Sequence, residues 1–184
     1  MARIGVVGGG PAGLSAGLFL AKNGQEAVVY DTDDTAMQYA HLFNYLGIES
    51  MDGEAYVETA REQAADFGVE RREAEVTSVQ TAGNGFTVAT DDDEAMYDYV
   101  VFATGQSRTL AADLGCETTD SGEIDVDRDG RTSVDGAYAA GWATRKQQIQ
   151  AVISAGDGAA AALDILSAEV EEGFHDFDTP SDAE

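Results

Sequence analysis

The sequence predicts an α/β fold, with a parallel sheet flanked by helices and a small antiparallel β-meander. Two apolar runs near the N-terminus, Ile4–Val7 and Ala27–Tyr30, are separated by a glycine-rich turn and a stretch with helical periodicity. A third run, Tyr99–Ala103, is continuously apolar, which is typical of a strand buried on both faces. This alternation favours helices that cover a parallel sheet.

The first unit of the chain has the order strand, turn, helix, strand, acid. Its turn reads Gly-x-Gly-x-x-Gly, with Gly8 for the tight turn, Gly10 for close approach of a pyrophosphate and Gly13 for helix–strand packing. Pro11 presets the first helical turn, where free N–H groups favour phosphate binding. This context predicts a Rossmann-type site for the ADP half of a dinucleotide. The alternative is a glycine-rich turn in an ordinary α/β protein.

An acidic residue, Asp31, follows Gly13 by 18 residues at the end of the second predicted strand. We expect its carboxylate to accept hydrogen bonds from both hydroxyls of a ribose. Its negative charge would also repel a 2′-phosphate, so NADP is disfavoured at this site.

The remaining elements follow from periodicity and from glycine signals. Helices are expected from Pro11 to Asn23 and from Gly53 to Phe67, each stopped by a following glycine. The other expected elements are strands over 75–79 and 85–89 within a β-meander over 75–95, a strand that ends at Gly105, a short strand over 136–141 and a final helix over 150–170. We assign residues 1–172 to one domain and expect the acidic residues 173–184 to form a disordered tail.

The chain is strongly acidic, with 35 Asp and Glu against 10 Lys and Arg and a formal net charge of −25. The acids are spread along the sequence, which opposes binding to nucleic acid or to an anionic membrane surface. Such a charge suits a halophilic cytoplasm, where salt screens the self-repulsion, and predicts loss of structure at low salt.

Cysteine usage and targeting signals narrow the class of protein further. Cys116 is the only cysteine, so no intrachain disulfide or Cys-x-x-Cys pair forms, and with two histidines it does not predict a metal site. The sequence has no signal-peptide pattern and no apolar run that approaches membrane-spanning length. We therefore expect a soluble, cytoplasmic protein.

Five separated segments stand in order between residues 3 and 166: the glycine-rich turn with its acid, Phe43-Asn44-Tyr45-Leu46-Gly47-Ile48, Ala103-Thr104-Gly105, the run 132–141, and Gln150-Ala151 with the Gly- and Ala-rich helix behind. Together they resemble the FAD-binding domain of the thioredoxin reductase-like flavoprotein disulfide reductases. The resemblance implies a single FAD/NAD(P)-binding Rossmann-type domain with FAD as the cofactor.

The resemblance also implies a role for each segment. Asn44 is expected near the isoalloxazine edge and the backbone near Val76 at the adenine. Gln150 and Ala151 would direct a helix N-terminus at the flavin, where the helix dipole stabilises negative charge. The expected cofactor-binding residues are Gly8, Gly10, Pro11, Ala12, Gly13, Asp31, Thr32, Asn44, Val76, Ala103, Thr104, Gly105, Gly141, Trp142, Gln150 and Ala151. The alternative is that these positions serve core packing and loop polarity.

Two departures from the family pattern bear on function. The family inserts an NAD(P)H domain after Ala-Thr-Gly, whereas here only residues 106–131 fill that gap, and the redox cysteine pair is missing. We therefore do not expect a disulfide reductase from this chain by itself. Trp142 stands where the family has an Asp that bonds the ribityl chain; its indole can donate a hydrogen bond, stack on the flavin or point outward.

Three further candidates each have two readings. Cys116, in a stretch that resembles a surface strand of the family, is either a reactive thiol or, as we favour, a bystander. Arg145-Lys146 either attracts an anionic substrate or an acidic carrier such as a ferredoxin, or is a solvated pair at the helix entry. His41 is either a proton donor above the flavin or, as we favour, a packing or exposed residue.

The leading hypothesis is a single-domain FAD flavoprotein, an oxidoreductase or electron-transfer protein, whose electron donor is a redox partner protein or NAD(P)H. Its catalytic residues are unknown. The alternative is a non-catalytic module that holds FAD or NAD and docks with a separate redox partner, and a homodimer is left open. A weaker reading places NAD alone in the N-terminal site.

Overall fold

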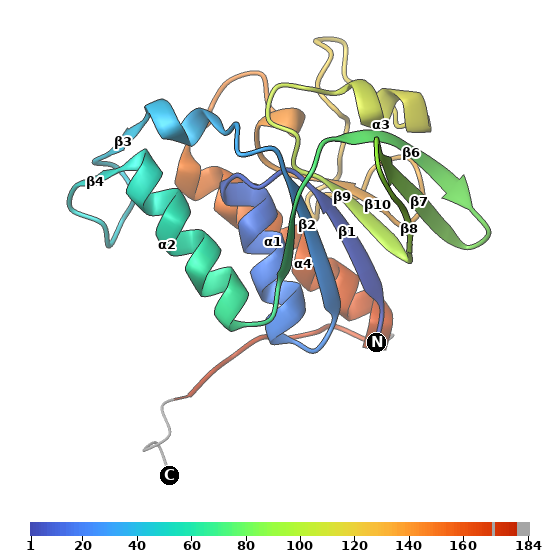
Figure 1. The fold of residues 1–184 in the computed structure, drawn as a ribbon, viewed down its shortest axis with the longest axis horizontal. Coiled ribbons are helices and arrows are strands. Elements are labelled where there is room, and N and C mark those ends of the chain that lie inside the picture. The colour runs from blue at the N-terminus through green and yellow to red at the C-terminus, as the bar shows by residue number, and fades with distance from the viewer. Residues whose placement is uncertain (171, 180–184) are drawn as a thin grey trace.

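A five-stranded parallel sheet forms the centre of the computed structural model, which describes residues 1–170 and 172–179 (Figure 1). Its strand order is β10-β9-β1-β2-β5, and all neighbours run parallel. The strands are β1 (Arg3–Val7), β2 (Glu26–Asp31), β5 (Glu70–Glu73), β9 (Tyr99–Phe102) and β10 (Ala137–Ala139). This order places the carboxyl ends of all five strands along one edge of the sheet.

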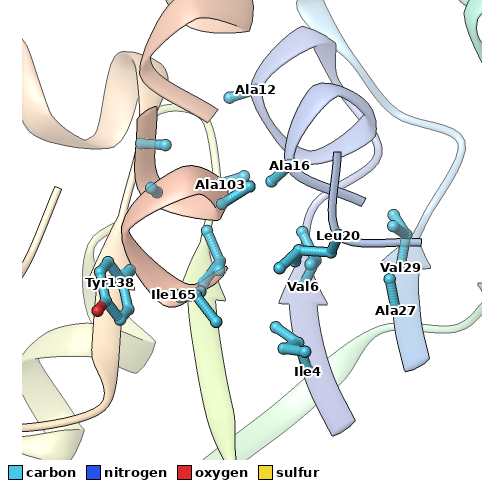
Figure 2. Close-up of a cluster of buried hydrophobic side chains, with 14 of the residues drawn as sticks. Ile4, Val6, Ala12, Ala16, Leu20, Ala27, Val29, Ala103, Tyr138 and Ile165 are labelled. Carbon is cyan, nitrogen blue, oxygen red and sulfur yellow. The ribbon is translucent and has the colours of Figure 1, made fainter. Parts of the chain in front are cut away.

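Three helices, α1 (Pro11–Lys22), α2 (Gly53–Asp66) and α4 (Ala151–Val170), cover one face of the sheet (Figure 1). Val6, Leu20 and Ile165 are fully buried in the core beneath them, and Figure 2 shows Leu20 of α1 against Val6 of β1. Removing such side chains from water supplies most of the driving force for this packing.

The opposite face is covered by an antiparallel meander and a short helix. The meander consists of β6 (Val76–Ala82), β7 (Gly85–Thr90) and β8 (Glu94–Tyr97), and the helix is α3 (Thr109–Leu114). Because side chains alternate along a strand, Val100 and Phe102 point into this second core whereas Val101 points into the first. The sheet is therefore buried on both faces, as its apolar runs predict.

A small layer completes the edge where the strands end. It contains the 3₁₀ turn η1 (Ala36–Tyr39), the hairpin of β3 (His41–Leu42) and β4 (Met51–Asp52), and the 3₁₀ turn η2 (Gly141–Thr144). Leu42 packs with Met37 and Val57, so that the hairpin is held against α2.

The elements that the sequence patterns missed include β5 and α3. The strand β5 has the sequence Glu-Arg-Arg-Glu, which lacks an apolar run because it lies at the sheet edge and has mostly exposed side chains. The helix α3 lies in a segment expected to be irregular. It ends at Gly115, in the left-handed region with φ 99°, and Cys116 follows it. The expectation that Cys116 lies on a surface strand is therefore wrong, because the residue is buried after this helix.

Helix α4 corrects the expectation that no apolar run approaches membrane-spanning length. An 18-residue window of this 20-residue helix has a mean hydropathy of 1.3, so by length and composition alone the helix is apolar enough to cross a bilayer. Ala161, Ile165 and Leu166 are buried against the protein's own core, which accounts for this apolar character in a globular domain.

The structure describes the end of the chain up to Thr179, with contacts that reach Asp178. Phe174 packs against the first core, and Lys22 forms an ion pair of 2.7 Å with Asp176. Part of the expected disordered tail is therefore described, with contacts at the C-terminal end of α1. The expectation for residues 180–184 concerns positions outside the described residues.

Candidate functional site

A cavity of about 790 Å³ lies at the carboxyl ends of β1, β2, β9 and β10. This is the edge at which open parallel sheets bind their ligands. All the predicted cofactor-binding residues line it except Gly13 and Gly141, which lie directly behind its wall. The fold thus brings together segments that are up to 143 residues apart, from Gly8 to Ala151.

The glycine-rich turn has the steric constraints that its sequence predicts. Gly8 has φ +117°, and a Cβ there would lie 2.2 Å from the carbonyl oxygen of Ala103. At Gly13 a Cβ would lie 1.8 Å from the carbonyl oxygen of Gly8, so helix α1 approaches the turn as closely as the chain permits. Any side chain at these positions would force the turn and the helix apart.

The N-terminus of α1 opens into the cavity. Gly10 is the N-cap, it makes no side-chain cap, and Pro11 is the first helical residue. A Cβ on Gly10 would contact only Thr35 Oγ1, at 3.3 Å, so the space beside this backbone is free for a ligand. The free N–H groups and the positive end of the helix dipole suit a pyrophosphate.

Asp31 is held in the cavity wall by three protein donors. Its side chain is 3% exposed, and Oδ2 accepts hydrogen bonds from Arg61 Nη2 at 2.6 Å and Arg71 Nε at 2.8 Å. Oδ1 accepts a bond of 2.9 Å from the backbone N–H of Asp33. Sequence reasoning missed both arginines, because Arg61 comes from α2 and Arg71 from the unpredicted strand β5.

These contacts alter the expected role of Asp31. Burial raises the pKa of its carboxyl, but the hydrogen bonds from Arg71 and Asp33 and the charge of Arg61 outweigh this, so the pKa lies below its usual value. The carboxylate is therefore ionised but has little acceptor capacity left for two ribose hydroxyls. Both arginines also offset the negative charge on which the expected rejection of a 2′-phosphate depends. Binding of the ribose hydroxyls by Asp31 and rejection of a 2′-phosphate both stay predictions.

The far end of the cavity joins two segments that the family resemblance assigns to the flavin. Asn44 Nδ2 donates a hydrogen bond of 2.8 Å to Gln150 Oε1. Gln150 directly precedes α4, and its carbonyl accepts the N–H of Ser154, so the helix N-terminus at Ala151 lies on the cavity wall. At the other end, Val76 lines the wall where β6 begins.

Trp142 is half-buried and is one of the residues that line the cavity. It lies in η2, immediately after β10. Among the described residues no hydrogen-bond partner is seen for its indole N–H. Its carbonyl accepts a bond of 3.1 Å from Arg108 Nη2, a contact that no motif indicated.

The remaining candidates have structural partners. Arg145 forms a two-pronged ion pair with Asp157 of α4, at 2.8 and 2.7 Å, which supports its reading as a helix-entry residue. His41 lines the cavity, with Nδ1 2.5 Å from Asp52 Oδ1 and Nε2 2.9 Å from Ser50 Oγ.

Sequence reasoning also missed Gly9, where a Cβ would lie 2.1 Å from Asp31 Cγ.

The residues present fit an extended dinucleotide. The cavity runs from an uncapped helix N-terminus, through the ends of β1 and β9, to a second helix N-terminus at Ala151. Gly10 leaves the space that a pyrophosphate needs. Fold and cavity together define a Rossmann-type dinucleotide-binding domain.

A family model described as pyridine nucleotide-disulphide oxidoreductase matches residues 2–109 and 48–159, and the chain belongs to this family. Thioredoxin reductase-like members of the family bind FAD. Thioredoxin reductase of Helicobacter pylori is 31% identical over 108 residues, which are 55% of this chain and 35% of that protein. Thioredoxin reductase of Spironucleus barkhanus is 28% identical over 107 residues, with the same coverage. The chain spans about a third of the length of these relatives.

Solved structures confirm the fold. A thioredoxin reductase from Gloeobacter violaceus superposes with a TM-score of 0.87 at 19% identity, over 97% of this chain and 98% of that one. The atypical thioredoxin reductase TRi from Desulfovibrio vulgaris gives 0.86 at 18% identity, over 94% and 99%. A ferredoxin-flavin thioredoxin reductase from Clostridium acetobutylicum gives 0.82 at 18% identity, over 93% and 99%.

Proposed function

We propose that this chain is an FAD flavoprotein that exchanges electrons with a separate redox partner or with NAD(P)H, and that it is not a disulfide reductase by itself. The observation that carries the proposal is the continuous cavity from Gly10 to the Asn44–Gln150 pair. The cavity offers sites for both halves of FAD. If NAD alone occupied the N-terminal site, the end of the cavity at Asn44 would have no ligand to contact.

The protein's own groups would bind and orient the cofactor. The N-terminus of α1 would hold the pyrophosphate, and the N-terminus of α4 would favour negative charge at the flavin. A bound flavin supplies hydride and electron transfer. Cys116 is buried, and burial raises the pKa of its thiol, so a thiolate is not available there for disulfide exchange.

The short segment that stands where the family has an inserted domain buries its own large apolar side chains. Among residues 105–135, all described, no large apolar side chain is exposed. The exposed apolar residues instead include Tyr39, Phe43 and Leu46, which are 87%, 74% and 97% exposed and flank Asn44 in the sequence. This position supports electron exchange with a docked partner near the flavin end. A second copy of the chain is the alternative occupant.

The test is an absorption spectrum of protein purified in high salt. Flavin bands that survive gel filtration are expected, together with quenching of Trp142 emission during FAD titration. Gly10→Val should abolish binding, because its side chain enters the cavity. Gly156→Val is the matched control, since a Cβ there meets nothing within 4 Å. A colourless wild type that cannot be reconstituted with FAD would overturn the proposal.

The donor is tested on the reconstituted protein under anaerobic conditions. Bleaching by NADH or NADPH would identify a nicotinamide donor, whereas inertness to both, with reduction by a ferredoxin, would identify a carrier protein. Inertness to every donor would support the non-catalytic module instead.

A further inference from the structure

Arg108 links two walls of the flavin end of the cavity. It follows the strand-end loop at Gly105 and is the N-cap residue of α3. Its Nη1 donates to the carbonyl of Gln106, and its Nη2 donates to the carbonyls of Trp142 at 3.1 Å and Arg145 at 3.5 Å. One planar guanidinium thus ties η2, in the second flavin segment, to the loop after β9.

The charge of Arg108 is not offset by an adjacent carboxylate. Within residues 1–170 and 172–179, its hydrogen-bond partners are all backbone carbonyls, and no Asp or Glu oxygen lies within 4 Å. Its Nε is buried without a partner. In contrast, Lys22 and most of the other arginines, namely Arg3, Arg61, Arg71, Arg72, Arg131 and Arg145, have a carboxylate within that distance.

The residue that Arg108 holds, Trp142, is neutral and lines the cavity. Ser107 and Thr109, on either side of Arg108, line it too, and the guanidinium is bonded to the carbonyl of Trp142, so its charge lies next to a lining residue. Charges act over longer distances in a partly buried, low-dielectric setting than in water. A cation here favours negative charge in the cavity.

We propose that Arg108 is a positioning residue, which fixes Trp142 at the cavity wall, and that its uncompensated positive charge beside this wall makes a bound flavin easier to reduce. The effect on flavin reduction rests on the proposed function. The positioning of Trp142 concerns this chain alone and can be measured without cofactor.

Trp142 is the only tryptophan of the chain, so its fluorescence reports on η2 directly. In cofactor-free protein, Arg108→Gln should shift the emission to the red and increase acrylamide quenching, because the turn loses its tie to the strand-end loop. The control is Arg128→Gln, which removes an exposed charge and should leave emission unchanged. Unchanged emission in Arg108→Gln would overturn the positioning role, whether or not FAD binds.

The charge effect is measured as the midpoint potential of bound FAD against a reference dye. Arg108→Gln should lower the equilibrium constant for reduction about tenfold, which is about 30 mV for a two-electron couple. Arg108→Lys keeps the charge but not the planar fork, so it should retain most of the potential while emission changes. An unaltered potential in Arg108→Gln, or an equal loss in Arg108→Lys, would overturn the electrostatic half.

Discussion

Asn44 Nδ2 lies 2.8 Å from Gln150 Oε1, although 106 positions separate the two residues in the chain. The pair joins the loop after β3 to the start of α4 at the flavin end of the cavity. It shows that two segments recognised separately in the sequence meet in space. Their shared function can be tested by removing each side chain in turn.

Asn44→Ala and Gln150→Ala should each weaken FAD binding about tenfold, equal to about 1.4 kcal/mol. Each removes a polar group from the cavity wall, and fluorescence titration measures the dissociation constant. Stability without cofactor should change by less than about 1 kcal/mol, because the pair is exposed. The control is Thr59→Ala, which removes an exposed hydrogen bond within α2. Equal FAD affinity in all four proteins would contradict a cofactor role for this pair.

Asp31→Asn should lower the free energy of unfolding by about 3 kcal/mol, because it leaves Arg61 and Arg71 without their buried partner. Urea titration of cofactor-free protein at neutral pH measures the loss. Asp33→Asn is the control, since that carboxylate is 54% exposed. If Asp31→Asn lowers the free energy of unfolding no more than Asp33→Asn does, Arg61 and Arg71 must move into solvent when their partner is removed.

The stabilisation from Asp31 should depend on pH in acid. Its pKa is lowered in the folded protein, so its contribution is complete above the unfolded value of about 3.9 and is lost as the pH falls through the folded pKa. The difference in stability between wild type and Asp31→Asn should therefore shrink below about pH 4. A difference that stays constant from pH 7 to pH 3 would contradict the ion-pair account.

Gly13→Ala should destabilise the protein by about 2 kcal/mol, because its Cβ would lie 1.8 Å from the carbonyl oxygen of Gly8. Thermal unfolding measures the effect. Gly156→Ala adds the same methyl group on an open face of α4 and should raise stability by about 0.5–1 kcal/mol. Similar melting temperatures for the two variants would contradict the close approach of α1 to the turn.

Low salt should unfold the protein, because the net charge of −25 is then poorly screened. Circular dichroism melting curves from molar to millimolar KCl measure the dependence, and a melting temperature independent of salt would contradict it. The salt-rich and cytoplasmic setting stays a prediction.

The sequence by itself determined the first βαβ unit and the three long helices, which depend on local signals: periodicity, the glycine spacing and proline at the helix start. The other segments that line the cavity were indicated by the resemblance to the flavoprotein family. Only the tertiary structure decided which charges meet. Arg61 and Arg71 reach Asp31, and Arg108 reaches the carbonyl of Trp142, through contacts between elements distant in sequence. Hydrogen bonds between side chains leave no periodic trace, so the setting of Asp31 could not be read from the chain alone. The strand β5 was missed because it is an exposed edge strand without an apolar run.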